Sequence, residues 1–360
     1  MSVVCTGIIM IQKSNLEKNI LITGGAGFIG SHTCVELLQK GYHVIVVDNL
    51  VNSSAEALKR VEEITGKKVT FYKGSLLDKE FLENVFQSEL FHYVIHFAGL
   101  KAVGESALKP LEYYQNNLTG SFVLLEVMRK YKVKNLIFSS SATVYGKPNT
   151  LPITEDFPVG CVTNPYGRTK FFLEEIFRDI YNADQEWNII LLRYFNPIGA
   201  HESGLIGENP NGIPNNLLPY VARVAVGTYP YIRIYGNNYN TPDGTGVRDY
   251  IHVVDLAKGH VKALEKMEKD VDSRNGIMRI YNLGTGIGYS VFDIIRAFSK
   301  ICGRRLPYRV EERRAGDIDV CYADTTKAQQ ELGWKAEFDL ERMCKDTYRW
   351  QVMNPNGYVK

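Results

Sequence analysis

The sequence lacks any run of about 18 apolar residues, the shortest segment that spans a membrane as a helix. It also lacks basic clusters, because 42 lysines and arginines are balanced by 40 acidic residues and the net charge is +2. We therefore expect neither a membrane nor a nucleic acid as partner. The six cysteines form no C-x-x-C pair and no H-E-x-x-H motif is present, so the sequence predicts reduced thiols, a cytoplasmic location and no metal site.

Residues 1–18 are interpreted as an N-terminal extension, because the first predicted strand begins at residue 19. The segment 3–11 (VVCTGIIMI) is apolar, but it has neither the preceding basic region nor the clear cleavage site of a signal peptide. With 360 residues, of which 45% are hydrophobic, the chain is long enough for two lobes with a buried core.

Short runs rich in Val and Ile alternate with amphipathic segments in the first half of the chain. Strands are predicted at 19–23, 42–48, 68–74, 92–99 and 135–141, and helices at 28–41, 54–65, 78–88 and 111–131. This alternation predicts an α/β fold with a doubly wound parallel sheet, a Rossmann-type domain over 19–195. Stretches rich in Gly, Asn and Pro follow, and they predict a smaller α/β C-terminal substrate lobe over 196–360, with a return to the first domain near 245–260 left open.

A glycine-rich turn follows the first predicted strand in ILITGGAGFIG (20–30). Gly25, Gly27 and Gly30 satisfy G-x-G-x-x-G, and Gly24 with the last two also satisfies G-x-x-G-x-x-G. Glycines at these places let a pyrophosphate approach the backbone, and the N-terminus of the next helix offers free N–H groups to the phosphates. The order of strand, turn and helix therefore predicts a dinucleotide site.

Asp48 closes the second predicted strand, 18 residues after Gly30. A carboxylate at this place accepts hydrogen bonds from the ribose hydroxyls of adenosine and repels a 2′-phosphate. The next residue is Asn49, whereas an arginine there would favour NADP. The sequence therefore predicts NAD as the cofactor.

Tyr166 and Lys170 lie four residues apart in NPYGRTK (164–170), at the start of a predicted helix, so they share one face. Such a pair alone is most often a surface feature. Here a serine cluster, Ser139–Ser141, ends a predicted strand at the sheet edge where ligands bind. A tyrosine base needs its pKa lowered by roughly three units, about 4 kcal/mol, and Lys170 and a cationic nicotinamide would both favour the phenolate. With Ser141 holding the substrate hydroxyl, these residues predict hydride transfer.

Beyond these motifs, the sequence resembles the extended short-chain dehydrogenase/reductase family, and within it the UDP-glucose (UDP-galactose) 4-epimerases. The resemblance covers residues 19–353. It is carried by TGGAGFIG (23–30), VVDNLVNS (46–53), HFAGLKAVGES (96–106), FSSSATVYG (138–146), NPYGRTK (164–170), LLRYFNPIGAH (191–201), GTGVRDYIHVVDLA (244–257), YNLGTG (281–286) and RRAGDIDVCYAD (313–324).

The resemblance implies transient oxidation of the sugar at C4 by NAD, rotation of the 4-keto sugar and its reduction on the other face. UDP-galactose and UDP-glucose would be the substrates, and NAD would stay bound between turnovers. The resemblance also implies a homodimer formed through a helix pair. An apolar stripe over 111–131 fits such a dimer and fits intramolecular packing equally well.

The resemblance further implies roles for individual residues, with Tyr166 as the base, Lys170 on the nicotinamide ribose and Ser141 on the sugar. The cofactor positions are Gly24, Gly25, Gly27, Phe28, Ile29, Gly30, Asp48, Asn49, Asn52, Ser53, Ser75, Leu76, Phe97, Ala98, Gly99, Lys101, Asn116, Ser139, Tyr166, Lys170 and Tyr194. The substrate positions are Lys101, Ser141, Ala142, Thr143, Tyr166, Phe195, Asn196, Asn216, Leu217, Arg233, Ile234, Tyr235, Arg248, Arg314, Asp317 and Cys321.

Some positions distinguish this chain from members of the family. Ser75 stands where the family usually carries an Asp that reads adenine, so either adenine binding is weaker or Asp78 substitutes. Cys321 stands where members restricted to UDP-glucose and UDP-galactose carry a tyrosine. Cysteine leaves room beside the sugar 2-position, so we expect activity also on UDP-N-acetylglucosamine and UDP-N-acetylgalactosamine, unless Cys321 is a buried thiol away from the sugar.

Other functions on the same fold stay open at this point. A nucleotide-sugar 4,6-dehydratase needs an Asp-Glu pair after the active-site threonine, but Val144 and Tyr145 follow Thr143. A UDP-glucuronate-type epimerase or decarboxylase needs a site for the sugar carboxylate, for which we find no motif. A non-catalytic NAD-binding regulator would not need an intact set of serine, tyrosine and lysine.

Overall fold

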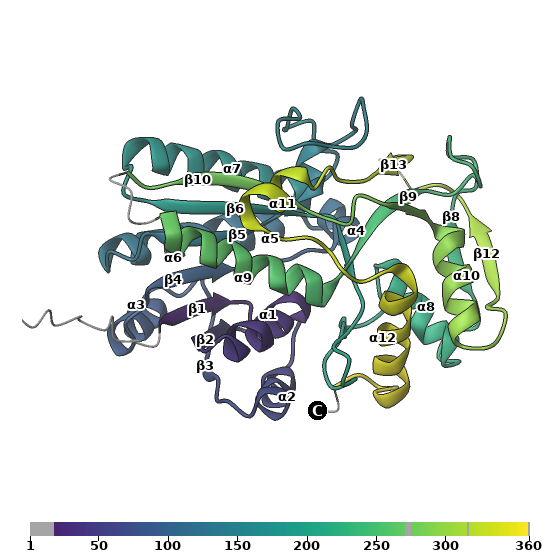
Figure 1. Cartoon of the computed structure of the whole chain (residues 1–360), viewed down its shortest axis with the longest axis horizontal. Coiled ribbons are helices and arrows are strands. Elements are labelled where there is room, and N and C mark those ends of the chain that lie inside the picture. The colour runs from purple at the N-terminus through teal and green to yellow at the C-terminus, as the bar shows by residue number, and fades with distance from the viewer. Residues whose placement is uncertain (1–17, 271–274, 315–316, 359–360) are drawn as a thin grey trace, which may run out of the picture.

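The computed structural model describes residues 18–270, 275–314 and 317–358, so the predicted extension, apart from its last residue, lies outside the described residues. A seven-stranded parallel sheet forms the larger part of the molecule, in the order β10-β6-β5-β4-β1-β2-β3 (Figure 1). Its strands are β1 (Asn19–Thr23), β2 (His43–Asp48), β3 (Thr70–Lys73), β4 (Tyr93–His96), β5 (Asn135–Ser141), β6 (Asn188–Tyr194) and β10 (Met278–Leu283). The strand order changes direction at β1, which is where such sheets bind ligands.

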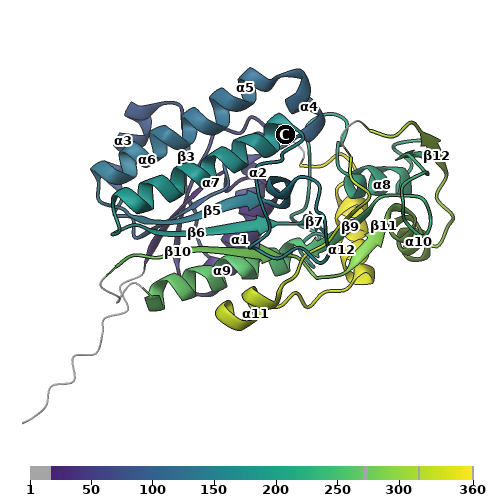
Figure 2. The ribbon, with the colours of Figure 1, turned by 90° about the horizontal axis from the view of Figure 1, so that it is seen from above.

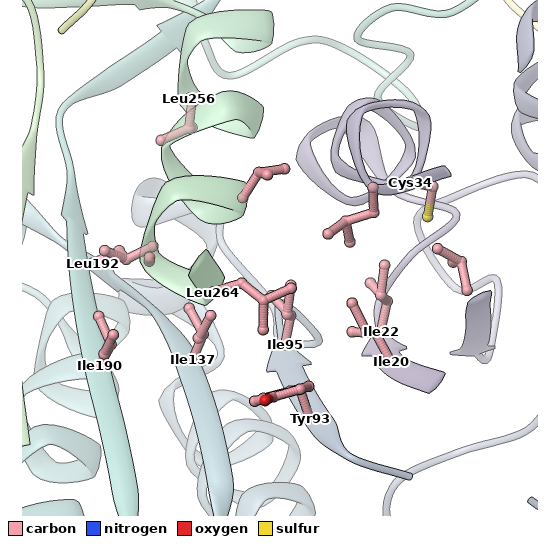
Figure 3. Close-up of a cluster of buried hydrophobic side chains, with 14 of the residues drawn as sticks. Ile20, Ile22, Cys34, Tyr93, Ile95, Ile137, Ile190, Leu192, Leu256 and Leu264 are labelled. Atoms are coloured by element: carbon pink, nitrogen blue, oxygen red, sulfur yellow. The ribbon is translucent and has the colours of Figure 1, made fainter. Parts of the chain in front are cut away.

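Helices cover both faces of this sheet, which confirms the predicted doubly wound α/β fold (Figure 2). One face is covered by α1 (Phe28–Gln39), α2 (Ala55–Thr65) and α9 (Val253–Asp270), and the other by α3 (Lys79–Ser88), α6 (Gly120–Lys130) and α7 (Pro165–Ala183). Figure 3 shows the first of these cores, in which Ile22, Ile95 and Ile137 of adjacent strands lie against α1 and α9. Burial on both faces explains why the strands are nearly continuous apolar runs.

The segment 111–131, predicted as one helix, is divided into α5 (Pro110–Tyr114), the π-turn η1 (Gln115–Thr119) and α6. Asn117 in the π-turn is buried, and its amide group accepts from the Leu100 N–H at 2.8 Å and donates to the Leu100 carbonyl at 3.0 Å. The same amide donates to Thr169 Oγ1 on α7 at 3.1 Å. The π-turn is only five residues long and lies between two α-helical segments, so the helical pattern of 111–131 did not indicate it.

Most residues after β6 build a smaller lobe, seen at the right of Figure 1. Its strands are β7 (Asn196–Ile198), β9 (Val247–His252), β11 (Gly288–Ser290) and β13 (Val320–Cys321) in one sheet, and β8 (Ile232–Tyr235) paired with β12 (Tyr308–Glu311). The helices α8 (Leu217–Ala225), α10 (Val291–Ile301) and α12 (Leu340–Met353) share its core. Shorter helices are α4 (Val103–Leu108), η2 (Ala142–Tyr145) and α11 (Thr326–Leu332).

The chain returns from the smaller lobe to the large sheet through α9 and β10. Helix α9 packs against α1, and β10 forms the outer strand beside β6. The return therefore continues to Leu283, beyond the segment 245–260 that the sequence left open. Within the described residues, no helix is both long and apolar enough to cross a membrane.

Candidate active site

The glycine-rich turn between β1 and α1 is packed so closely that a side chain would not fit at Gly24 or Gly30. Gly24 has a φ of +74°, and a Cβ there would lie 2.8 Å from the Ala98 amide nitrogen. A Cβ on Gly30 would lie 2.4 Å from the Gly24 carbonyl oxygen. Helix α1 begins after Gly27, and no side chain caps its first N–H groups. The turn thus offers a close backbone approach and open amide donors to a phosphate group.

The Asp48 carboxylate is buried at the end of β2 and lines the same cleft as the glycine turn. Its Oδ2 accepts from the Ala26 N–H at 3.1 Å. Its Oδ1 accepts from the Leu50 N–H and from the Ser53 hydroxyl, each at 2.8 Å. These bonds hold an anion in a fixed place, where it suits ribose hydroxyls and repels a phosphate.

The cleft at the carboxyl ends of the strands gathers nearly all of the predicted cofactor residues. They are Gly24, Gly27, Phe28, Ile29, Gly30, Asp48, Asn49, Asn52, Ser53, Ser75, Leu76, Phe97, Ala98, Gly99, Lys101, Asn116, Ser139, Tyr166, Lys170 and Tyr194. Gly25 is not among the lining residues. A Cβ on Gly25 would lie 2.7 Å from Cγ2 of Val46, so this glycine serves the packing of the turn against β2.

The cleft also has lining residues that the sequence did not indicate, among them Glu208 and Tyr358. Glu208 forms an ion pair with Lys101 at 3.1 Å and accepts from the Asn216 side chain at 2.9 Å. It therefore joins a predicted cofactor residue to a predicted substrate residue. The Tyr358 hydroxyl accepts from the Gly207 N–H at 3.3 Å across 151 positions of sequence. No local spacing signals a contact of this kind.

Ser75 occupies the place where an adenine-reading Asp was expected. It lines the cleft, and its hydroxyl accepts from the Leu77 N–H at 3.2 Å. Asp78 does not line the cleft, because its carboxylate caps α3 by accepting from the Phe81 N–H at 3.0 Å. Asp78 is therefore the cap of α3, and the structure gives no support to the idea that Asp78 contacts adenine in place of the family's usual Asp.

Lys170 is buried on α7, and its ammonium donates to the Ser139 carbonyl at 2.6 Å and to the Ser139 hydroxyl at 3.2 Å. Helix α7 starts just before it, where the Asn164 side chain accepts from the Gly167 N–H at 2.9 Å. Burial lowers the pKa of Lys170 to about 7, and the negative charge of Glu174 acts in the opposite direction.

Tyr166 lies in the cleft with its pKa raised to about 12, because burial disfavours the charged phenolate. A hydrogen bond with the Ser141 hydroxyl opposes this rise. The net shift of the Tyr166 pKa is therefore upward, opposite to the lowering that we expected from Lys170, whose ammonium donates to the Ser139 carbonyl. A cation placed in the cleft by a ligand would favour the phenolate.

The Ser141 hydroxyl lies at the junction of β5 and η2. Its oxygen accepts from the Thr143 N–H at 3.2 Å and from the Thr143 hydroxyl at 3.0 Å. Because both of these bonds use Ser141 as an acceptor, its own proton is available to donate to Tyr166 or to a sugar oxygen.

The remaining predicted substrate residues do not line this cleft. They are Ser141, Ala142, Thr143, Phe195, Asn196, Asn216, Leu217, Arg233, Ile234, Tyr235, Arg248, Arg314, Asp317 and Cys321. Arg248 forms an ion pair with Asp317, and the Arg314 guanidinium lies 3.9 Å from the centre of the Tyr235 ring. Ile234 is 1% exposed in the core of the smaller lobe, so its side chain is not available to a ligand.

Cys321 is buried on β13, paired in register with Arg248 of β9. It belongs to a small core that contains Phe195 and Tyr145, with Ala142 packed against it. The sequence left open that Cys321 is a buried thiol away from the sugar. The thiol is buried, but it lies among residues that are predicted to contact the sugar.

No group of three or more His, Cys, Asp or Glu side chains could hold a metal ion in the part of the chain that the structure describes. His92 and His96 are four residues apart, but each is used elsewhere. His96 bonds to Thr23 Oγ1 at 2.7 Å and to Ser121 Oγ at 2.8 Å, and His92 Nδ1 accepts from the Asn19 N–H at 3.1 Å.

The chain is similar to known proteins over nearly its whole length. Residues 21–347 match the family model described as GDP-mannose 4,6 dehydratase. The chain is 63% identical to the UDP-glucose 4-epimerase of Bacillus subtilis (94% of this chain, 98% of that protein) and 55% identical to that of Homo sapiens (95% and 99%). The crystal structure of UDP-glucose 4-epimerase from Bifidobacterium longum in complex with NAD⁺ and UDP is 58% identical with a TM-score of 0.91, covering 95% of this chain and all of that one.

These matches cover 94–95% of the chain and so extend across both lobes. A match of this strength over almost the full length of both proteins is not confined to the nucleotide-binding motif, which many enzymes share. The chain belongs to the UDP-glucose 4-epimerase family of extended short-chain dehydrogenases/reductases.

Proposed function

We propose that this protein interconverts UDP-galactose and UDP-glucose with NAD as its resident cofactor. The observation that carries the proposal is that Asp48, Tyr166 and Lys170 meet the glycine turn in one cleft. The names of the curated relatives and the NAD⁺ and UDP complex of the Bifidobacterium longum enzyme support it. The direct test is incubation of the purified protein with UDP-galactose, without added NAD, and measurement of UDP-glucose. No product with either added or resident NAD would refute the proposal.

The chain's own residues fit NAD. The close approach at Gly24 and Gly30 and the uncapped start of α1 suit the pyrophosphate, and the fixed Asp48 carboxylate suits the unphosphorylated ribose. When bound, NAD supplies the capacity to take a hydride from the sugar C4 and return it.

Tyr166 is the proposed base, which takes the proton of the sugar 4-hydroxyl and later gives it back. Ser141 has a free proton with which it orients that hydroxyl or Tyr166. Lys170, whose ammonium is held by the Ser139 carbonyl at 2.6 Å, would bind the nicotinamide ribose. Burial raises the pKa of this phenol to about 12, and a cation bound in the cleft would lower that pKa again.

The smaller lobe is proposed to hold the UDP part of the substrate. Arg248 and Arg314 supply two guanidinium groups suited to a diphosphate, and each is already oriented, by Asp317 and by the Tyr235 ring respectively. Glu208 and its partners Lys101 and Asn216 bridge this region to the cofactor cleft.

We also propose that UDP-N-acetylglucosamine and UDP-N-acetylgalactosamine are substrates. The support is the small Cys321 side chain among Phe195 and Ala142, where a tyrosine ring would occupy space needed by an N-acetyl group. A 4,6-dehydratase finds no support in the site, because the Tyr145 hydroxyl is committed to Asn282 at 2.7 Å and Val144 is fully buried.

The purified protein is expected to carry a dinucleotide, because an epimerisation without net redox change gives NAD no reason to leave. Denaturation followed by enzymatic assay of the supernatant should find NAD and no NADP. The Asp48→Asn variant keeps the shape but removes the charge, so it is expected to retain less NAD. Recovery of NADP from the wild type would contradict the proposed role of Asp48.

We propose a cytoplasmic homodimer. The five cysteines within the described ranges are free thiols, which suits a reducing compartment. Leu111 on α5, Phe122 on α6 and Phe172 on α7 are 64%, 41% and 38% exposed, and α5 and α7 are in contact. These side chains form an apolar surface suited to a second copy of the chain.

The Phe172→Glu variant is expected to be a monomer, because a carboxylate in an apolar interface has no partner there. Size-exclusion chromatography with light scattering measures the mass. Val352→Glu on α12, where the side chain is 51% exposed, is the control and should leave the mass unchanged. A wild-type protein that is monomeric at micromolar concentration would rule out the dimer.

A further inference from the structure

Glu174 lies buried on α7, one turn beyond Lys170, and both of its carboxylate oxygens are engaged. Its Oε1 accepts from the Ser140 hydroxyl at 2.5 Å and from Arg193 Nε at 3.0 Å. Its Oε2 accepts from Arg193 Nη2 at 2.6 Å. The side chains of Glu174 and Arg193 are 0% and 1% exposed, so this is a fully buried ion pair with fork geometry.

The two partners of Glu174 stand on one rung of the sheet. Ser140 of β5 and Arg193 of β6 are register partners. The rung before them contains Ser139, which binds Lys170, and the rung after them contains Ser141, which bonds to Tyr166. Glu174 therefore fastens α7 to β5 and β6 between the two serines that meet the proposed catalytic residues.

Arg193 extends the connection to the turn that follows Ser141. Its Nη1 donates to the Tyr145 hydroxyl at 2.9 Å and to the Glu155 carbonyl at 3.1 Å. Tyr145 is the last residue of η2, and its hydroxyl donates to Asn282 Oδ1 on β10 at 2.7 Å. One arginine thus holds α7, η2 and the strand ends in a single arrangement.

Stability alone does not account for this pair, because the desolvation of two charges is often not recovered and apolar replacements can be equally stable. The location beside Lys170 offers a second reason. Burial lowers the pKa of Lys170 to about 7, and the Glu174 charge raises it. Without that charge, the ammonium would be lost at still lower pH.

Other ionisable groups near Lys170 do not replace Glu174. The elements packed against α7 and the neighbouring strand β4 bring Glu105 (α4), Tyr113 (α5), Tyr145 (η2), Arg193 and Tyr194 (β6) and His96 (β4) toward this region. Burial raises the pKa of the three tyrosines and lowers that of His96 to about 3, so all four are uncharged near neutral pH. Glu105 pairs with Lys109 at 3.1 Å on the exposed side of α4.

We propose that the Glu174–Arg193 pair positions Lys170 for the reaction, by holding α7 at a fixed place on β5 and β6 and by keeping the Lys170 ammonium charged. The kinetic part of this inference rests on the proposed epimerase function. The effect on Lys170 itself does not, and it can be measured without turnover.

The first measurement is the titration of Lys170 in the purified protein. Acetic anhydride is applied at a series of pH values, and acetylation of the Lys170 peptide is quantified by mass spectrometry. Glu174→Gln keeps the shape of the side chain and removes its charge, so the midpoint is expected to fall by about one pH unit relative to wild type. An unchanged midpoint would overturn the inference even if the enzyme is an epimerase.

The second measurement is the pH profile of epimerisation. In Glu174→Gln, we expect kcat to fall by about tenfold to a hundredfold with little change in KM. The reason is that a displaced or uncharged Lys170 impairs the reaction itself and not the binding of the substrate. The alkaline limb of the profile should move to lower pH, in the same direction as the acetylation midpoint. A profile that is lowered uniformly, without moving along the pH axis, would show a merely structural role.

Two further variants keep the test decisive. Glu174→Gln leaves Arg193 buried without its partner, so the double variant Glu174→Gln/Arg193→Met, which removes both charges, is tested for folding by circular dichroism. Loss of the Arg193 cation offsets part of the loss of the Glu174 anion, so its midpoint should lie between those of wild type and Glu174→Gln, whereas kcat should stay lowered because α7 is no longer fastened to β6. Asp184→Asn is the control, because it removes a carboxylate at the exposed end of α7, where Asp184 pairs with Lys134 at 2.7 Å. The inference would be refuted by a folded double variant with the kcat of wild type, or by a midpoint shift in Asp184→Asn equal to that in Glu174→Gln.

Discussion

Replacement of Tyr166 by phenylalanine is expected to lower epimerisation by about 10²–10⁴-fold while the fold and the bound NAD are retained. The change removes one hydroxyl and leaves the ring, so packing in the cleft hardly changes. It deletes the group that is proposed to take the proton from the sugar 4-hydroxyl. The measurements are kcat with UDP-galactose, the NAD released on denaturation and the melting temperature.

Tyr181→Phe is the matched control for this variant. Tyr181 lies near the end of the same helix, and its hydroxyl donates to the Gly276 carbonyl at 3.1 Å, away from the residues that line the cleft. Loss of that hydroxyl should leave kcat within about twofold of wild type, as is usual for a change outside the site. Near-wild-type turnover in Tyr166→Phe would remove Tyr166 from its role as the base.

Cys321→Tyr is expected to lower activity on UDP-N-acetylglucosamine by about a hundredfold or more, while activity on UDP-galactose is largely retained. The physical reason is steric. Cys321 is 8% exposed and belongs to a small core with Phe195, against which Ala142 packs, so a tyrosine ring there would not fit within the core and is expected to take up space beside the proposed sugar site. Both substrate pairs are assayed on wild type and variant, together with the melting temperature.

Cys321→Ser is the control for the change of size, because serine is as small as cysteine and should keep both activities. Failure of the wild type to epimerise UDP-N-acetylglucosamine would show that the proposed substrate range is too wide. Equal handling of the N-acetyl substrates by wild type and Cys321→Tyr would show that residue 321 does not limit the space beside the sugar.

The sequence by itself was sufficient for features that depend on neighbouring residues. The alternation of strands and helices, the glycine turn before α1 and Asp48 at the end of β2 are local patterns, and the structure shows the expected sheet with these residues at its ligand-binding edge. Tyr166 and Lys170 were also recognisable, because their four-residue spacing needs only one helical turn.

Only the tertiary structure decided the environment of these residues. Burial, which no sequence motif encodes, raises the pKa of Tyr166 to about 12 and lowers that of Lys170 to about 7. The contact of Gly207 with Tyr358 joins residues 151 positions apart. The rung that brings Ser140 and Arg193 to Glu174 likewise depends on strand register, which is set by packing of whole elements and not by any short stretch of the chain.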